Sequence, residues 1–482
     1  MVHGSRSTSA SINAACSAHP LCSSSARPGR PLGPDRVTTT WNIAMPTSMA
    51  TRRSRVARHG SAGSVARMAA SPYRVLLHSG PVRWQALSGL LAQTTQGAGG
   101  IGIILVLHGL HRSLALAGAV VGALSVAAGV ARPVQGRLID RRGPRGLMAL
   151  CGIVHPGALA AIVALADGQA PGATLIAAAV VAGVTLPPVS TCMRVAWGTA
   201  VADGDRTSAY SLVYLTQEFS ILAGPLLLAA VVSATSASTA LVTVAAVACA
   251  GTLAFAASLP AELPRGTALS GASGGGGRSG GSEDSGRGSS GDGGVLIAPG
   301  MPALIATAVL VGGVIGALQV GVPIFATAHG APAASGLLIA ALSVGGIAGA
   351  AIYGGRSWRP SPTVRLLALL TGLGFVVAIT VVASGLVVLG GALALAGLLL
   401  NPSLTTISLH VDWHVSRARA AEAFGWLSTG IASGTGAANA IAGAVSRPGA
   451  ARPAFVVATA AGVAAALLVA TARGRLARHH AR

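Results

Sequence analysis

Runs of about twenty apolar residues recur along this chain from Trp84 onward. As a helix rising 1.5 Å per residue, each run is long enough to cross about 30 Å of hydrocarbon. With 52% hydrophobic and 9% charged residues among 482, the chain has more apolar surface than one soluble core could bury. We therefore expect an all-α integral membrane protein with twelve transmembrane helices, at residues 85–107, 114–134, 147–166, 173–196, 209–232, 239–259, 302–325, 332–353, 366–383, 388–409, 421–443 and 454–472.

The formal net charge of +21 is unevenly distributed, since eleven Arg and a single Asp lie in residues 1–83. If both termini are cytoplasmic, the cytoplasmic loops after runs two, four, eight and ten carry ten Arg, and the outer loops carry three. This asymmetry follows the positive-inside rule, so we predict a multi-pass plasma-membrane protein with both ends in the cytoplasm. The positive charge then reflects membrane orientation, and we expect the lipid bilayer rather than nucleic acid as the partner.

Two segments lack apolar runs. Residues 1–67 are rich in Ser, Arg, Gly and Pro, so we expect a disordered basic extension over 1–80. An organelle transit peptide has this composition, but a start codon set too far upstream explains it equally well, with Met68 as the favoured start. The other segment, 261–298, is a Gly/Ser tract typical of a flexible linker.

This tract divides the twelve runs into six plus six. Such a division indicates two bundles related as parallel repeats, an arrangement typical of transporters. We predict an N-terminal six-helix bundle, a cytoplasmic linker, a C-terminal six-helix bundle and a cytoplasmic tail, over residues 81–260, 261–298, 299–476 and 477–482.

The most specific local pattern is G-R-L-I-D-R-R-G-P-R at residues 136–145, between runs two and three. Small Gly residues suit a tight turn, and Asp140 can lie at a helix end and pair with neighbouring Arg. The pattern resembles the G-x-L-x-D-R-x-G-R-[RK] signature of major facilitator superfamily transporters, with Pro144 in place of the first closing basic residue. The resemblance implies a cytoplasmic latch between the bundles at Gly136, Asp140, Arg141 and Arg145, within a motif that also contains Arg137 and Gly143.

An ordinary positively charged loop is the alternative, although it would explain the Arg residues better than Asp140 between two glycines. A related pattern, Y-G-G-R-S-W-R at residues 353–359, follows run eight and supports the repeat. It lacks the Asp, so the resemblance does not extend a latch role to it.

Arg194 lies within run four, four residues before Gly198. This spacing resembles the R-x-x-x-G element of the same family, in which the Arg is tied to proton coupling. A charge near the bilayer centre costs about 2.5–3.5 kcal/mol on insertion scales, so such a residue usually faces a cavity or a partner. Alternatively, Arg194 lies near the cytoplasmic end and extends to lipid phosphates. Pro187 and Pro188 precede it and predict a kink beside a pathway.

Glu218 is the only carboxylate well inside any of the runs. Burial favours its neutral form unless Arg194 or another cation keeps it charged, and a carboxylate poised between the two forms suits proton coupling. Tyr214, Gln217 and Glu218 lie at i, i+3 and i+4, which makes one face of this helix polar. A structural Glu218–Arg194 ion pair is the alternative.

Gly224 and Pro225 in the same run resemble the core of the fifth-helix motif of drug:proton antiporters. Ser220 stands where that motif has Gly, which weakens the inference to antiport. The remaining polar residues in the runs could line a central cavity, or they could hold helices together by hydrogen bonds; they are Gln93, Gln96, Gln319, Asn401 and His155. Three small-xxx-small pairs predict close helix packing: Gly312/Gly316, Gly345/Gly349 and Gly430/Gly434.

Other chemistry finds no support in the sequence. His410, Asp412 and His414 have superficial metal-ligand spacing, but we expect a solvated helix end and no metal site. The chain contains no phosphate-binding loop and no catalytic motif. We therefore expect a protein that is not an enzyme and has no cofactor, with the proton gradient as its energy source.

The sequence thus predicts a monomeric secondary transporter that resembles actinobacterial major facilitator members described as drug or sugar efflux proteins. We expect it to export a small molecule by proton antiport and alternating access. A proton symporter importing a sugar or other metabolite has the same fold, and a non-transporting sensor or scaffold is the alternative from another class. A neutral, amphipathic or anionic substrate fits the runs better than a polycationic one.

Overall fold

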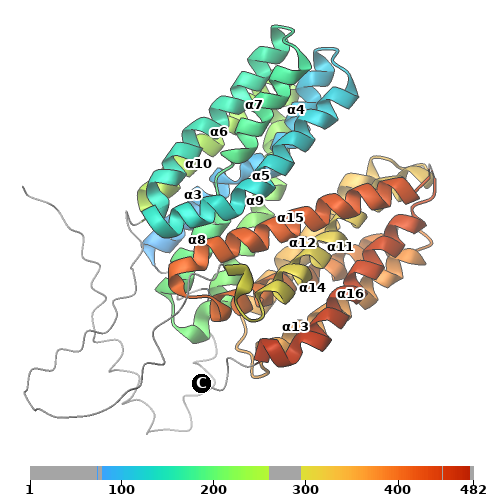
Figure 1. Ribbon diagram of the computed structural model, residues 1–482. Coiled ribbons are helices and arrows are strands. Elements are labelled where there is room, and N and C mark those ends of the chain that lie inside the picture. The colour runs from blue at the N-terminus through green and yellow to red at the C-terminus, as the bar shows by residue number, and fades with distance from the viewer. Residues whose placement is uncertain (1–72, 74–78, 260–294, 448, 478–482) are drawn as a thin grey trace, which may run out of the picture. The chain divides into compact units, whose positions relative to one another are not determined.

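The computed structural model describes residue 73 and residues 79–259, 295–447 and 449–477. Most of the predicted basic extension, most of the Gly/Ser linker and nearly all of the tail lie outside these residues. The described chain is helical, apart from turns and one isolated β-bridge between Arg447 and Ala450. Figure 1 shows the helices in chain order.

Every predicted run corresponds to one helix or to two consecutive helices. In the first half these are α3 (Gly80–Ala92) with α4 (Thr94–Gly109), α5 (Leu114–Arg142), α6 (Pro144–Asp167), α7 (Gly172–Val184) with α8 (Val189–Ala200), α9 (Arg206–Ala234) and α10 (Ala237–Ser258). In the second half they are α11 (Met301–Ala328), α12 (Ala334–Gly354), α13 (Pro362–Val381), α14 (Leu386–His414), α15 (Ala420–Val445) and α16 (Arg452–Ala477).

Eleven spans among the described residues are long and apolar enough to cross a membrane. The eleventh predicted run, 421–443, corresponds to α15, which has 26 residues but is not among these eleven spans. It carries polar residues along its length, including Ser428, Thr435 and Asn439. The all-α class is therefore as predicted, and each of the twelve predicted runs is helical.

Pro187 and Pro188 divide run four into α7 and α8, as predicted. The carbonyl groups freed by this break are satisfied from α5. Gln135 Nε2 donates to the carbonyl oxygens of Val184, at 2.8 Å, and Leu186, at 3.2 Å. The break between α7 and α8 is thus stabilised by hydrogen bonds from a side chain of α5.

Gly143 forms the turn between α5 and α6 with φ of 83°, a conformation that L side chains rarely adopt. Pro144 follows at the start of α6, where its fixed φ suits a helix and its missing N–H is not needed. Gly136 does not take part in this turn, so that part of the prediction is wrong. It lies inside α5, where a Cβ atom would come 2.6 Å from the Cα of Glu422, so its small size lets α5 and α15 approach closely.

The two halves repeat the same packing pattern. In the first half, α4 packs on α9, α5 on α7 and α6 on α10. The equivalent pairs in the second half are α11 with α15, α12 with α14 and α13 with α16. Gly312 and Gly316 lie against the backbone of α15, and Gly345 and Gly349 against that of α14, which confirms close packing at these pairs. The halves meet through two equivalent pairs, α5 with α15 and α9 with α12.

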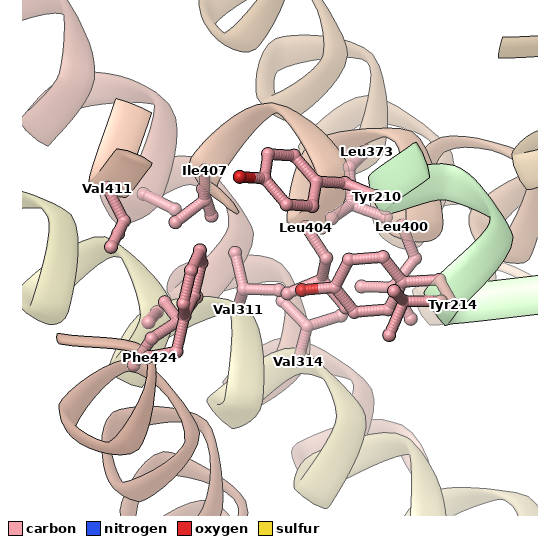
Figure 2. Packing of buried hydrophobic residues seen from close by; sticks show 14 of the residues in the cluster. Tyr210, Tyr214, Val311, Val314, Leu373, Leu400, Leu404, Ile407, Val411 and Phe424 are labelled. Atoms are coloured by element: carbon pink, nitrogen blue, oxygen red, sulfur yellow. The ribbon is translucent and has the colours of Figure 1, made fainter. Parts of the chain in front are cut away.

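Both halves contribute to one buried hydrophobic cluster. Figure 2 shows Tyr210 and Tyr214 of α9 extending among residues of α11, α14 and α15. The rings of Tyr210 and Phe424 lie 5.9 Å apart and tilted by 60°, a favourable aromatic arrangement. Helices α5, α12 and α14 finish, and α9 and α15 begin, at the same end of the bundle, which we call the latch end. The rings of Tyr210 and Phe424 lie toward this end.

Candidate functional site

Asp140 joins the two halves at the latch end. Its Oδ1 accepts a hydrogen bond from the N–H of Ala421 at 3.0 Å, and its Oδ2 accepts from the N–H of Glu422 at 2.8 Å. These N–H groups belong to the first turn of α15, whose own cap residue, Arg419, makes no side-chain cap bond. The first N–H groups of a helix lack partners within it and carry partial positive charge. Asp140 on α5 therefore caps a helix of the other half.

An ion pair lies beside this cap. Arg137 Nε donates to Glu422 Oε1 at 2.7 Å. Arg141 and Arg145, which the family resemblance placed in the latch, are exposed, and their side chains make no latch contact among the described residues. The predicted pairing of Asp140 with neighbouring Arg is also wrong, because its partners are backbone N–H groups.

The equivalent crossing of α9 and α12 is held at the same end. Ser208 Oγ donates to the carbonyl of Gly354 at 2.5 Å, and the hydroxyl of Tyr73 donates to the carbonyl of Ala350 at 2.6 Å. Burial raises the pKa of Tyr73 to about 12, so its hydroxyl keeps its proton at neutral pH. The 353–359 pattern therefore lies at an interhalf contact even though it lacks the Asp.

A second ion pair links the halves through α14. Arg206 Nη1 lies 2.6 Å from Asp412 Oδ2, and Arg206 Nη2 lies 2.9 Å from Asp203 Oδ1. The neighbouring His410 and His414 are buried, so the predicted solvated helix end is wrong. Sequence reasoning missed this pair because its partners are 206 positions apart.

Between the halves lies a cavity of about 320 Å³. Its lining comes from both halves: Gln96, Ser125, Ala128, Gly129, Arg132, Leu186, Ser190, Arg194, Tyr214, Gln217, Glu218 and Ile221 in the first, and Ile315, Leu400, Asn401, Leu404, Ser428, Ile431 and Ala432 in the second. The structure thus brings together six predicted residues, namely Gln96, Arg194, Tyr214, Gln217, Glu218 and Asn401.

Glu218 of α9 reaches across to the second half. Asn401 Nδ2 of α14 donates to Glu218 Oε1 at 3.1 Å. Gly346 of α12 faces this pair, and a Cβ atom there would come 2.6 Å from Asn401 Nδ2 and 3.1 Å from Glu218 Oε1. Among the described lining residues Glu218 is the only acid. The Glu218 carboxylate therefore links the two halves, and the absence of a side chain at Gly346 leaves room for this hydrogen bond.

Gly346→Ala is expected to break the Glu218–Asn401 hydrogen bond because one side chain must move to relieve the contact. Wild-type and variant protein should fold alike, while any transport that depends on Glu218 should fall severalfold. Flux into proteoliposomes measures the change, with Gly336→Ala, a position open on all sides, as the control. Unchanged flux in Gly346→Ala would show that the bond is not needed.

Arg194 is 3% exposed, so its side chain does not extend to the surface. Its guanidinium carbon lies 4.8 Å from the ring centre of Tyr214 and 5.8 Å from that of Phe424. Nη2 makes a long hydrogen bond of 3.4 Å to Gln217 Oε1, whereas Nε and Nη1 have no partner in the described part of the chain. The structural alternative from the sequence, an ion pair with Glu218, does not occur among the described residues.

Arg132 is a cavity residue that sequence reasoning missed. Its Nη1 makes long contacts with the carbonyl of Leu186, at 3.4 Å, and with Gln135 Oε1, at 3.5 Å. The signal was present, since Arg132 is a charged residue inside run two and precedes Pro133. A second cation therefore lies in the same cavity as Arg194.

The remaining predicted residues bond within their own helix, join neighbouring helices or lie elsewhere. Gln93 is buried and donates to the carbonyl of Gly89, and His155 contacts the carbonyl of Ala182 and the hydroxyl of Thr95. Gln319 is exposed and is not among the cavity-lining residues.

The Gly224-Pro225 motif lies at a close crossing of α9 and α4. A Cβ atom on Gly224 would meet the carbonyl of Thr94, and Pro225 Cδ would lie 3.2 Å from a Cβ on Gly97. The motif therefore acts here as a packing element, and it is not among the residues that line the cavity.

Comparison with known proteins agrees with this arrangement. A bacterial homologue of the iron transporter ferroportin, in an outward-facing state, superposes with a TM-score of 0.63 at 14% identity, covering 82% of this chain and 99% of that one. FucP, a transporter in the outward conformation, gives 0.59 at 13% identity, covering 81% and 98%. The human organic anion transporter MFSD10 gives 0.57 at 15% identity, covering 83% and 99%. At such identities the likeness shows the fold alone.

No curated protein matches the chain significantly in sequence. The model of one family does match, over residues 86–412, and its description is Major Facilitator Superfamily. These residues include the α5–α6 turn, both cavity Arg residues and Glu218. The chain therefore belongs to the Major Facilitator Superfamily and has the fold of its secondary transporters.

Proposed function

We propose that the protein is a proton-coupled secondary active transporter of a small molecule, and that Glu218 carries the proton. The observation that carries this proposal is the position of Glu218, the one acid among the described cavity residues, hydrogen-bonded across the halves to Asn401. A hydrogen bond to a charged carboxylate is about twice as strong as one between neutral groups. Protonation of Glu218 therefore weakens its hydrogen bond with Asn401, which joins α9 to α14. In this way proton binding favours separation of the two halves.

Export in exchange for protons is the first candidate for the direction of transport. In this scheme the latch end faces the cytoplasm, following the distribution of Arg in the loops. The hydrogen bonds between the halves that Asp140, Ser208 and Glu218 make lie between the latch end and the middle of the helices. The conformation is then outward-open, with the latch closed.

Symport is the second candidate, favoured by the charge of the cavity. Two Arg and one Glu line it, so an anion is the ligand that its field favours. An ionised Glu218 repels an anion, whereas a protonated one does not. Proton and anion then strengthen each other's binding, by the reciprocity of linkage, and travel in the same direction.

Proteoliposomes containing a pH-sensitive dye distinguish these candidates without knowledge of the protein's orientation. When a transported compound is added outside, antiport makes the lumen more alkaline because protons leave as the compound enters. Symport makes the lumen more acidic. A compound that enters with no proton movement in either direction contradicts the proposal, and failure of every compound in a broad metabolite and drug library favours a non-transporting sensor or scaffold.

We also propose that the protein is a plasma-membrane monomer that uses the proton gradient alone, without a cofactor, and that its six-helix bundles comprise residues 81–260 and 299–476. Both termini then face the cytoplasm. Labelling of single cysteines introduced at Arg142 and Gln169 by an impermeant reagent tests this orientation. Only the cysteine at position 169 should react in intact cells, and the reverse result overturns it.

A further inference from the structure

The cavity is lined by a cation, Arg194, whose hydrogen-bonding capacity is largely unused. Arg194 is more than nine-tenths buried, and its Nε and Nη1 find no acceptor among the described residues. A guanidinium has five N–H donors, and here only the long contact to Gln217 occupies one of them. Burying a charge without partners is costly, so this arrangement favours the arrival of an anionic acceptor.

The guanidinium also lies near two aromatic rings. Tyr214 and Phe424 present their rings to it, one from each half, at 4.8 and 5.8 Å from the guanidinium carbon. The hydroxyl of Tyr214 is itself within 3.0 Å of Ser408 Oγ. Cation–π attraction to aromatic rings stabilises a guanidinium without using its N–H donors. Nε and Nη1 therefore remain available to an oxyanion with two acceptor oxygens.

The rest of the cavity suits a small organic body. Arg132 adds a second positive charge with only long contacts of its own. Apolar side chains supply much of the remaining wall: Ile221, Ile315, Leu400, Leu404 and Ile431. The volume of about 320 Å³ is at the low end for sites that hold drug-sized ligands. An inorganic ion would leave this apolar wall without a partner.

We propose that the cavity binds a small organic monoanion, with its carboxylate or sulfonate on Arg194 and its apolar body against the aliphatic wall. This inference rests on the symport form of the proposed transport function and names its substrate class. The charged groups that share the cavity with Glu218 are Arg194 of α8 and Arg132 of α5, whereas α14 presents the neutral Asn401. Protonation of Glu218 therefore removes the one negative charge that opposes the anion.

Isothermal titration of the full-length protein in nanodiscs tests the proposal with three anions, naphthalene-2-sulfonate, benzoate and hexanoate. Each has a neutral amide or sulfonamide counterpart of nearly the same shape. We expect at least one anion to bind, its neutral counterpart to bind about tenfold more weakly or not at all, and affinity to rise as the pH falls. Failure of all three anions to bind at millimolar concentration overturns the proposal, as does equal binding of anion and amide.

Variants locate the site. Arg194→Gln should weaken anion binding about 30-fold, and Arg194→Lys, which keeps the charge but loses the fork of N–H donors, should weaken it less. Glu218→Gln should tighten binding at pH 7.5 and remove its pH dependence. The matched control is Arg365→Gln on α13, a partly buried Arg whose Nε and Nη1 also find no acceptor among the described residues, but which does not line the cavity. Unchanged affinity in a folded Arg194→Gln protein overturns the assignment.

The two proposals fail separately. If dye-loaded proteoliposomes show proton-coupled transport that Glu218→Gln abolishes, but no anion binds through Arg194, only the substrate class is wrong. If anions bind through Arg194 while coupling survives Glu218→Gln, the substrate class stands and the proton site is wrong.

Discussion

Glu218→Gln is expected to abolish accumulation driven by a pH gradient while leaving exchange of substrate across the membrane in place. A gradient of one pH unit stores about 1.4 kcal/mol per proton, which supports about tenfold accumulation when one proton moves per substrate. A Gln side chain can still accept a hydrogen bond from Asn401 Nδ2, so the contact of α9 with α14 persists. It cannot gain or lose a proton, so the accumulation ratio should fall from about ten to about one.

Flux of a labelled compound that moves in the dye assay measures this ratio, with and without the gradient. Counterflow in the absence of a gradient should remain within severalfold of wild type, which separates loss of coupling from loss of folding. Asp167→Asn, an exposed carboxylate at the end of α6 and outside the cavity, is the matched control and should accumulate like wild type. Full accumulation by Glu218→Gln would remove the proton role from this residue.

The helices could be predicted from the sequence because a membrane span leaves a strong local signal. Twenty apolar residues must be helical in hydrocarbon, where every backbone N–H and C=O needs a partner within the segment. This reasoning placed α13 and α14 as two helices even though only Val382, Ala383, Ser384 and Gly385 separate them. It placed the break at Pro187 and Pro188 for the same local reason, a lost N–H.

Partners across the two halves could not be predicted in this way. The motif identified Asp140, but nothing local indicates that its oxygens accept from the N–H groups of Ala421 and Glu422, which lie about 280 positions later. Gly136 was assigned to a turn because small residues serve turns and close crossings alike. Only the position of α15 distinguishes these two roles.

The cavity was predictable in part, through the cost of polar residues in hydrocarbon. Glu218 and Arg194 stood out because each interrupts an apolar run, and both line the cavity. Arg132 interrupts a run equally, but its position two residues before the end of the predicted run 114–134 made it resemble the loop charges that follow. Depth in the bundle, which separates a cavity Arg from a loop Arg, comes from the continuation of α5 to Arg142.

Asp140→Asn is expected to shift the protein strongly toward a state with the latch end open. Asp140 accepts one hydrogen bond on each carboxylate oxygen from the first turn of α15. Asn has only one accepting oxygen, and its NH₂ group would face the other N–H donor. The favourable interaction of a negative charge with the helix N-terminus is lost as well. Two charge-assisted hydrogen bonds contribute about 3 kcal/mol together, which corresponds to a shift of about 100-fold in the equilibrium.

Distances between spin labels on cysteines introduced at Arg142 and Ala418, exposed positions on either side of the latch, report this opening directly. The distribution should be narrow and short in the labelled parent and dominated by longer distances in Asp140→Asn. Arg141→Gln is the matched control: family resemblance placed Arg141 in the latch, but it is exposed and makes no latch contact in the described chain. A change in Arg141→Gln with none in Asp140→Asn would reverse the roles of these neighbours. The ion pair of Arg137 with Glu422 is left intact in both variants, so a partial shift in Asp140→Asn would measure how much of the latch that pair sustains alone.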